Sequence, residues 1–172
     1  MNDSVRYPAG DWDAGAFFAT LVKRNRLAKE HDFRYAAVSG LQGFADALTD
    51  MHGGRSFVCV SDVSDGFTDL NNPSSRRIKT VFLAMRHTAD NHRMAEARKQ
   101  CMIIMRELFR QFMSALNQEK SRIDCGLIGI DSRVSFNEME RYFFSGCACA
   151  YFQIAVDLRE SLCYNPEEWE DE

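Results

Sequence analysis

The stretch from residue 90 to residue 118 constrains the fold more than any other part of the chain. Its apolar residues recur at steps of three and four, the spacing that places side chains on one face of an α-helix. At about 1.5 Å per residue, a helix of this length spans about 40 Å, enough to cover a sheet. The apolar series is Met94, Ala97, Cys101, Ile104, Met105, Leu108, Phe112 and Ala115.

The remaining segments predict shorter elements on both sides of this helix. Two further amphipathic stretches predict helices, and Asp11 or Asp13 and then Ser39 are suitable N-caps for them. Compact apolar or alternating runs predict strands. The expected helices cover 13–30 and 40–50, and the expected strands cover 31–38, 56–61, 77–87, 125–130 and 147–158.

Two segments are harder to assign. Residues 62–76 are rich in Asp, Ser, Asn, Gly and Pro, so we expect a loop that joins its two neighbouring strands into a long hairpin. Residues 133–144 mix the helical and the strand periods. Across 133–158 as a whole, strand and buried helix stay open as alternatives, with strand favoured for the part after residue 146.

The order of elements predicts an α+β fold. We expect a mixed or antiparallel sheet with an extended β-hairpin, packed on one face by the long helix and by the N-terminal helix. A chain of 172 residues is the usual size of one domain, so 1–172 is taken as a single unit. Residues 1–12 are expected to form an arm, and 164–172 an acidic tail.

Composition indicates the compartment. The sequence has no apolar run long enough to cross a membrane, and its first residues lack the pattern of a signal peptide. We therefore expect a protein that stays in the cytoplasm, without membrane contact. In that compartment cysteines in apolar runs are expected to be free thiols in the core rather than disulfides. They are Cys59, Cys101, Cys125, Cys147, Cys149 and Cys163.

Motifs of known chemistry are missing from the sequence. It contains no Gly-rich phosphate loop and no nucleophile elbow. The spacing of Cys147 and Cys149 is not that of a zinc or redox pair. We therefore expect a protein that is not an enzyme and holds no cofactor or metal. The alternative is an unrecognised small-molecule or metal site, near His87, Asp90 and His92 or in the acidic stretch 62–69.

Charge is distributed unevenly along the chain. Residues 1–75 carry 7 basic and 10 acidic side chains, residues 76–122 carry 11 and 4, and residues 123–172 carry 3 and 11. The net charges of −3, +7 and −8 add up to the formal −4 of the chain. Three hypotheses stay open: the segments neutralise each other or face water separately, they attract other copies, or the basic segment contacts nucleic acid.

The order of elements over residues 13–160 resembles that of phage tail-terminator and head-to-tail connector (neck) proteins. The stretches that carry the resemblance are the hairpin strand Arg77-Ile78-Lys79-Thr80-Val81-Phe82-Leu83-Ala84-Met85 and the closing strand from Gly146 to Leu158. The resemblance implies a structural virion protein. Such proteins assemble as homo-oligomeric rings, commonly hexamers, that bind tail-tube and neck proteins and let DNA pass. It also implies a location in the virion after synthesis in the host cytoplasm.

The resemblance assigns roles to particular residues as well. The hairpin and the acidic tail would contact neighbouring subunits, through Asp65, Phe67, Asp69, Glu167, Glu168 and Trp169. Basic residues would face a lumen, making non-specific contact with DNA, or a neighbour, namely Arg76, Arg77, Lys79, Arg98, Arg106 and Arg110. A third alternative beside assembly protein and ligand-binding domain is an adaptor that binds another protein through its acidic C-terminus.

Overall fold

Both helices and strands are present in the part of the chain that the computed structural model describes, which is residues 12–50, 56–71, 74–86, 93–123, 128–139 and 147–159. The helices are α1 (Ala14–Arg24), α2 (Arg26–Glu30), α3 (Gly40–Asp50) and α4 (Met94–Ile123). The strands are β1 (Phe33–Val38), β2 (Ser56–Ser61), β3 (Asp65–Asp69), β4 (Ser74–Arg86), β5 (Ile128–Ile130), β6 (Ser135–Met139) and β7 (Cys147–Arg159).

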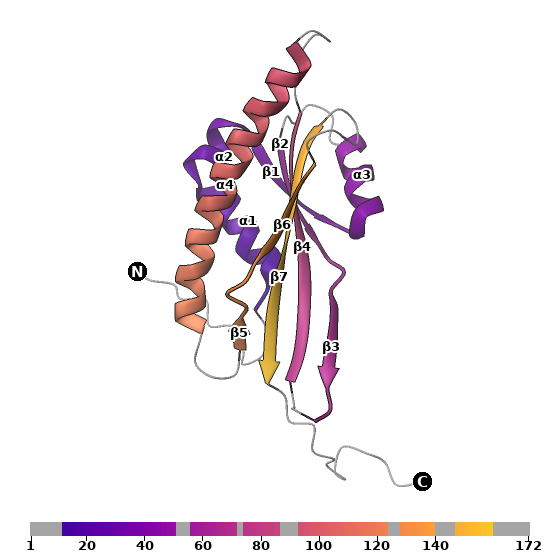
Figure 1. The fold of residues 1–172 in the computed structure, drawn as a ribbon, viewed down its shortest axis with the longest axis vertical. Coiled ribbons are helices and arrows are strands. Elements are labelled where there is room, and N and C mark those ends of the chain that lie inside the picture. The colour runs from indigo at the N-terminus through magenta and orange to yellow at the C-terminus, as the bar shows by residue number, and fades with distance from the viewer. Residues whose placement is uncertain are drawn as a thin grey trace.

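All seven strands belong to one mixed sheet, built around β4 and β7 (Figure 1). These two strands pair antiparallel over their full length, from Ser74 opposite Arg159 to Arg86 opposite Cys147. β2 and β3 follow one another along the outer edge of β4, and β5 and β6 do the same along β7. β1 pairs with β2 in parallel. The α+β class and the mixed sheet predicted from the sequence are confirmed.

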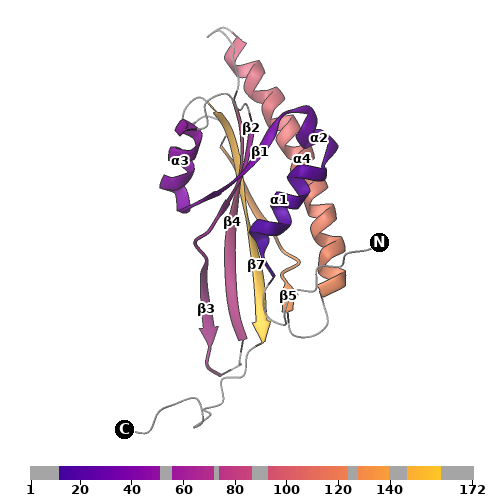
Figure 2. The same cartoon turned by 180° about the vertical axis from the view of Figure 1, so that it is seen from behind.

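The sheet is covered differently on its two faces. Successive side chains of a strand point to opposite faces, and in β2 Val58 and Val60 join the core beneath α1 and α4, whereas Phe57 and Cys59 join a second core beneath α3. The prediction that α4 and the N-terminal helix share one face is confirmed (Figures 1 and 2). The sequence did not predict that α3 lies on the other face.

The predicted helix over 13–30 is interrupted at Asn25. Asp13 caps α1 as expected, because its carboxylate accepts hydrogen bonds from the backbone N–H of Gly15 (2.7 Å) and of Ala16 (3.2 Å). Asn25 has extended backbone angles, and its side chain accepts a bond from the N–H of Ala28 (2.8 Å). Asn25 therefore ends α1 and begins α2, which corrects the single helix expected there.

The loop predicted over 62–76 is wrong in its middle and at its end. Residues 65–69 form β3, which pairs antiparallel with the first part of β4, and β4 itself begins at Ser74. The prediction was wrong because residues 65–69 have the composition of a turn, and composition alone does not show that they pair with another strand. The hairpin is nevertheless present, with β2 and β3 together forming the strand opposite β4.

The structure also extends the long helix and resolves the stretch after residue 133. α4 continues to Ile123, beyond residue 118 where the predicted helix ended. Part of the ambiguous stretch 133–144 is the strand β6, and the strand expected over 147–158 is present as β7. Residues 1–11 of the predicted arm 1–12, the alternative site at His87, Asp90 and His92, and the predicted tail 164–172 lie outside the described residues.

Four cysteines lie in the described strands and helices, and all are buried as predicted: Cys59, Cys101, Cys147 and Cys149. Cys125 and Cys163 lie outside the described residues. Burial raises the pKa of Cys59 and of Cys149 to about 12, since a thiolate loses its hydration there. These thiols therefore fill the core and are poor nucleophiles at neutral pH.

We expect Cys59 and Cys149 to resist alkylation in the folded protein. At pH 8 a thiol of pKa about 12 is almost fully protonated, and the thiolate is the form that reacts. Iodoacetamide labelling followed by peptide mass spectrometry should find both cysteines unmodified in buffer and fully modified in concentrated urea. Rapid labelling without denaturant would contradict their burial.

Candidate functional site

The β3–β4 hairpin carries much of the exposed apolar surface found in the described part of the chain. Of six exposed large apolar side chains there, three lie in β3 or at its two ends, namely Val63 (53% exposed), Phe67 (62%) and Leu70 (82%). One edge of β3 pairs with β4, and no described strand pairs with its other edge. The free edge of β3 is a place where another chain can add.

Phe67 lies on the face of the sheet that α3 covers only in part. It is directly opposite Arg76, which is directly opposite Asp157, and residues opposite each other in antiparallel strands share a face. β3 and the neighbouring ends of β4 and β7 continue well beyond α3 (Figures 1 and 2). The hairpin therefore presents Phe67 on an uncovered part of the sheet.

Glycine at position 66 allows β3 to pair closely with β4. A Cβ atom at Gly66 would lie 2.0 Å from the carbonyl oxygen of Arg76, which is a steric clash. The hydroxyls of Thr68 and Ser75 join the same two strands at 2.9 Å. Asp65 and Asp69 stand at the two ends of β3.

The second feature is a groove between α4 and the edge formed by β5 and β6. It consists of two adjoining hollows of about 290 and 260 Å³. The larger one is almost entirely apolar and is lined by Leu83, Met105, Arg106, Phe109, Phe136, Glu138, Ala150, Tyr151 and Phe152. The smaller one is lined by Phe109, Met113, Leu116, Asn117, Lys120, Ile130, Asp131, Ser132, Val134 and Phe136.

The rings of Phe109 and Phe136 line both hollows. The ring of Phe109 on α4 contacts the ring of Phe136 on β6, with centroids 5.3 Å apart, and the ring of Phe152 on β7 at 5.1 Å. Phe136 is 56% exposed although it contacts this cluster. The ring of Phe136 is therefore an accessible apolar part of the groove.

An ion pair closes one side of the larger hollow. Arg106 on α4 donates two hydrogen bonds to the carboxylate of Glu138 on β6, from Nε to Oε1 at 2.7 Å and from Nη2 to Oε2 at 2.5 Å. The hydrogen bond from Arg106 lowers the pKa of Glu138 below its ordinary value. The pair joins the helix to the edge strand and leaves the hollow without net charge from these two groups.

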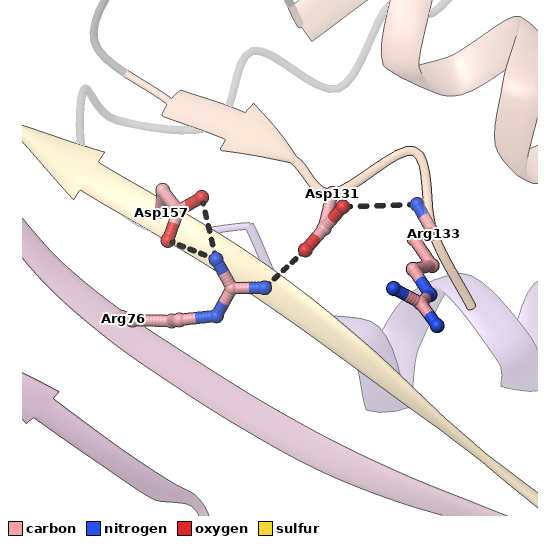
Figure 3. A network of polar contacts seen from close by, with 4 residues as sticks. All are labelled: Arg76, Asp131, Arg133 and Asp157. Atoms are coloured by element: carbon pink, nitrogen blue, oxygen red, sulfur yellow. Dashed lines mark hydrogen bonds and ion pairs between the residues drawn. The ribbon is translucent and has the colours of Figure 1, made fainter. Parts of the chain in front are cut away.

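Arg76 anchors the other end of the groove wall from the opposite face of the sheet. Its guanidinium donates to Asp131, just after β5, and to both carboxylate oxygens of Asp157 on β7, at 3.3 and 3.2 Å (Figure 3). Asp131 also accepts a hydrogen bond from the backbone N–H of Arg133 at 2.9 Å. Asp131 and the residues that follow line the smaller hollow.

Asp131 is held ionised by these contacts. The backbone N–H of Arg133 lowers the pKa of Asp131 below its ordinary value, and the hydrogen bond from Arg76 lowers it further. β5 has only three residues, and its pairing with β7 is correspondingly short. The contact between Asp131 and Arg76 stabilises this edge strand by attaching it to the central strand β4 as well. The Arg76 contacts thus support the wall of the groove.

The structure distributes the six predicted basic residues over different surfaces. Arg76 shares a face with Phe67, whereas Arg77 and Lys79 alternate onto the opposite face. Arg110 is bound to Glu107 on the same helix, with bonds of 2.8 and 2.6 Å. Nε of Arg98 is buried and has no hydrogen-bond partner within the described residues.

Among the predicted interface residues, Asp65, Phe67 and Asp69 come together on β3. The other three, Glu167, Glu168 and Trp169, lie outside the described residues. The first hypothesis on charge, mutual neutralisation, is observed for part of the chain. Arg76 and Arg106 of the basic segment 76–122 pair with Asp131, Asp157 and Glu138 of the acidic segment 123–172.

The groove was not predicted from the sequence. Its residues come from α4, β4, β5, β6 and β7 and from the residues between β5 and β6, which are far apart in the sequence. The alternation in residues 135–139 was a usable signal, because it puts Phe136 and Glu138 on one face of a strand. Opposite net charges in segments 76–122 and 123–172 were a second signal for pairs such as Arg106 with Glu138.

The described residues contain no group of three or more His, Cys, Asp or Glu side chains able to hold a metal. They also contain no helix that is long and apolar enough to cross a membrane. Comparisons with protein-family models and with curated proteins found no match. Hypotheses about function therefore depend on the hairpin and the groove.

Replacing Arg76 by methionine should lower the free energy of unfolding by about 1–2 kcal/mol at pH 7, because Asp131 and Asp157 lose their charged donor. The folded-state pKa of Asp131 is depressed, so this contribution is present above the ordinary value near 3.8 and is lost as the pH falls through the lower folded value. Urea unfolding at pH 7 and in steps below pH 4 measures both effects.

Arg133→Met is the matched control for this experiment. It removes an exposed arginine from the segment between β5 and β6 that also contains Asp131. It keeps the backbone N–H of residue 133, which donates a hydrogen bond to Asp131. Its effect on the free energy of unfolding should stay within about 0.5 kcal/mol. Equal decreases in the free energy of unfolding of the two variants would show that Arg76 has no special role in holding the segment between β5 and β6.

Proposed function

We propose that this chain is a structural, non-enzymatic assembly protein that forms homo-oligomeric rings, as a tail terminator or head-to-tail connector of a virion. The observation that carries the proposal is the free edge of β3 with the exposed Phe67, Val63 and Leu70 around it. Exposed apolar side chains grouped on one projecting hairpin mark an interaction surface. One edge of β3 pairs with no described strand, so a strand from another subunit can add there and extend the sheet.

The distribution of charge supports contacts of the head-to-tail kind. β3 carries Asp65 and Asp69 without a basic residue, whereas α4 carries six Lys and Arg against three Glu. Elements of opposite net charge on different parts of one molecule favour a heterologous contact, which closes into a ring when the rotation permits. The proposed partners are further copies of this chain and the tail-tube and neck proteins on either side of the ring.

Contact with DNA is a subsidiary part of the proposal. Arg77 is exposed on β4, and Arg106 and Arg110 retain exposed guanidinium groups although each pairs with a glutamate. Exposed cations of this kind attract the phosphate backbone without reading sequence.

A small-molecule-binding domain is the second candidate function. The observation that favours it is the larger hollow of the groove, which has an apolar lining and a few polar groups. Ligand sites commonly combine these features, although a volume of 290 Å³ is at the lower end of their range.

Phe67→Ser should weaken self-association of the purified protein by roughly 10- to 100-fold, because burying a phenylalanine contributes about 1.5–3 kcal/mol. Light scattering over a concentration series, at low and high salt, gives the mass of the oligomer. The wild type should form a ring-sized species that loosens in high salt, since salt screens contacts between oppositely charged surfaces.

Leu41→Ser is the matched control, because Leu41 is also exposed (52%) but lies on α3, away from the hairpin. It should leave the oligomer unchanged. A wild-type protein that stays monomeric at every concentration and salt level would refute the proposed function. Equal weakening by both variants would remove the hairpin from it.

A further inference from the structure

We propose that the larger hollow of the groove is the receptor for Phe67 of a neighbouring copy of the chain. The inference rests on the proposed function and adds to it the surface that the hairpin contacts. It joins two features that are otherwise unexplained. One is an aromatic side chain that is 62% exposed on a projecting strand, and the other is an accessible apolar hollow of about 290 Å³.

The size of the hollow suits an aromatic side chain. An apolar cavity of about 150 Å³ is large enough to bind benzene, so a volume of 290 Å³ accepts the benzyl group of Phe67 with part of the hairpin backbone. Phe109, Phe136 and Phe152 line the hollow, and aromatic rings gain from edge-to-face and offset contact with another ring. Arg106 and Glu138 neutralise one another at its side, so an uncharged occupant fits better than an ion.

The occupant has to come from another molecule. Phe67 shares a face with Arg76 and Asp157, whereas Ala150 and Phe152, which line the hollow, alternate onto the opposite face of β7. The pairing of β4 with β7 runs without interruption from end to end, so no bulge reverses this alternation. Phe67 and the hollow of one copy therefore lie on opposite sides of the same sheet.

This placement determines the type of contact. When the projecting residue and its receptor lie on different surfaces of one molecule, each copy binds the next through a heterologous interface. The lining of the groove carries as many acidic as basic side chains, Glu138 and Asp131 beside Arg106 and Lys120, so it suits an inserted side chain without charge. These observations favour a second copy of the chain over a small molecule as the occupant, because the binding of a small molecule would not explain why Phe67 is exposed.

The test uses two variants that disable different halves of the contact. Phe67→Ala removes the side chain that inserts and leaves the hollow intact. Ala150→Phe fills the hollow with a ring from its own wall, where Ala150 is half-buried, and leaves Phe67 in place. Each variant alone should associate at least roughly 10-fold more weakly than the wild type.

Mixing the two variants gives the decisive result. The Phe67 of Ala150→Phe can still enter the open hollow of Phe67→Ala, but neither partner can bind a third copy. Native mass spectrometry of an equimolar mixture should therefore find a one-to-one heterodimer and no ring, while each variant alone is monomeric. Ala150→Leu repeats the experiment with a smaller addition, in case the phenylalanine prevents folding.

Ala36→Phe is the control for an added ring. Ala36 is also a half-buried strand alanine, but it packs in the other core, beneath α3. Once thermal unfolding has shown that it folds, it should assemble as the wild type does. A mixture that stays monomeric, or an Ala150→Phe variant that assembles normally while the wild type forms rings, would overturn the inference and leave the proposed function standing.

A wild type that is always monomeric would overturn both proposals. In that case the fluorescent apolar probe anilinonaphthalene sulfonate distinguishes the remaining role of the hollow. Probe binding to the wild type that is lost in Ala150→Phe and kept in Ala36→Phe would assign the hollow to a small apolar ligand.

Discussion

The pairing of β4 with β7 is the interaction on which the rest of the structure depends. These strands are the longest in the described sheet, and each of the other strand pairs except β1 with β2 uses one of them. Their uninterrupted register decides which side chains face α4 and which face α3. It also places Arg76 opposite Asp157, and it carries β3 on one side and β5 with β6 on the other. The hairpin and the groove thus lie on opposite sides of the same pair of strands.

The sequence was sufficient for elements whose signal is local. The three- and four-residue steps of 94–115 predicted α4, and the continuous apolar run at 56–61 predicted a strand buried on both faces. β3 was missed because Asp65, Gly66 and Asp69 are typical of turns, and only the pairing with β4 makes them a strand. The break at Asn25 was missed because its cap is completed by a tertiary contact, from its Nδ2 to Gln111 at 2.8 Å.

The candidate site was predictable only in part, for the same reason. Phe67 was named together with Asp65 and Asp69 because the resemblance to tail-terminator and connector proteins implies that the hairpin contacts neighbouring subunits. The groove forms where α4, β6 and β7 pack together, and no local sequence pattern predicts such a contact between distant segments. Charge was an intermediate case. The contrast between 76–122 and 123–172 is visible in the sequence, but the structure was needed to show that Arg76 and Arg106 use it within one molecule.

The long ladder also affects how the protein is made. The paired residues of β4 and β7 are separated by 61 positions at one end (86 to 147) and by 85 at the other (74 to 159). A ribosome therefore releases β4 long before its partner exists, and β5 and β6 have nothing to pair with until β7 emerges. Contacts between such distant residues form slowly, and unpaired apolar strand edges promote aggregation in the meantime. A nascent chain halted before residue 147 leaves the edge of β4 that pairs with β7 open along its whole length, and it is the form of this molecule that most needs a chaperone.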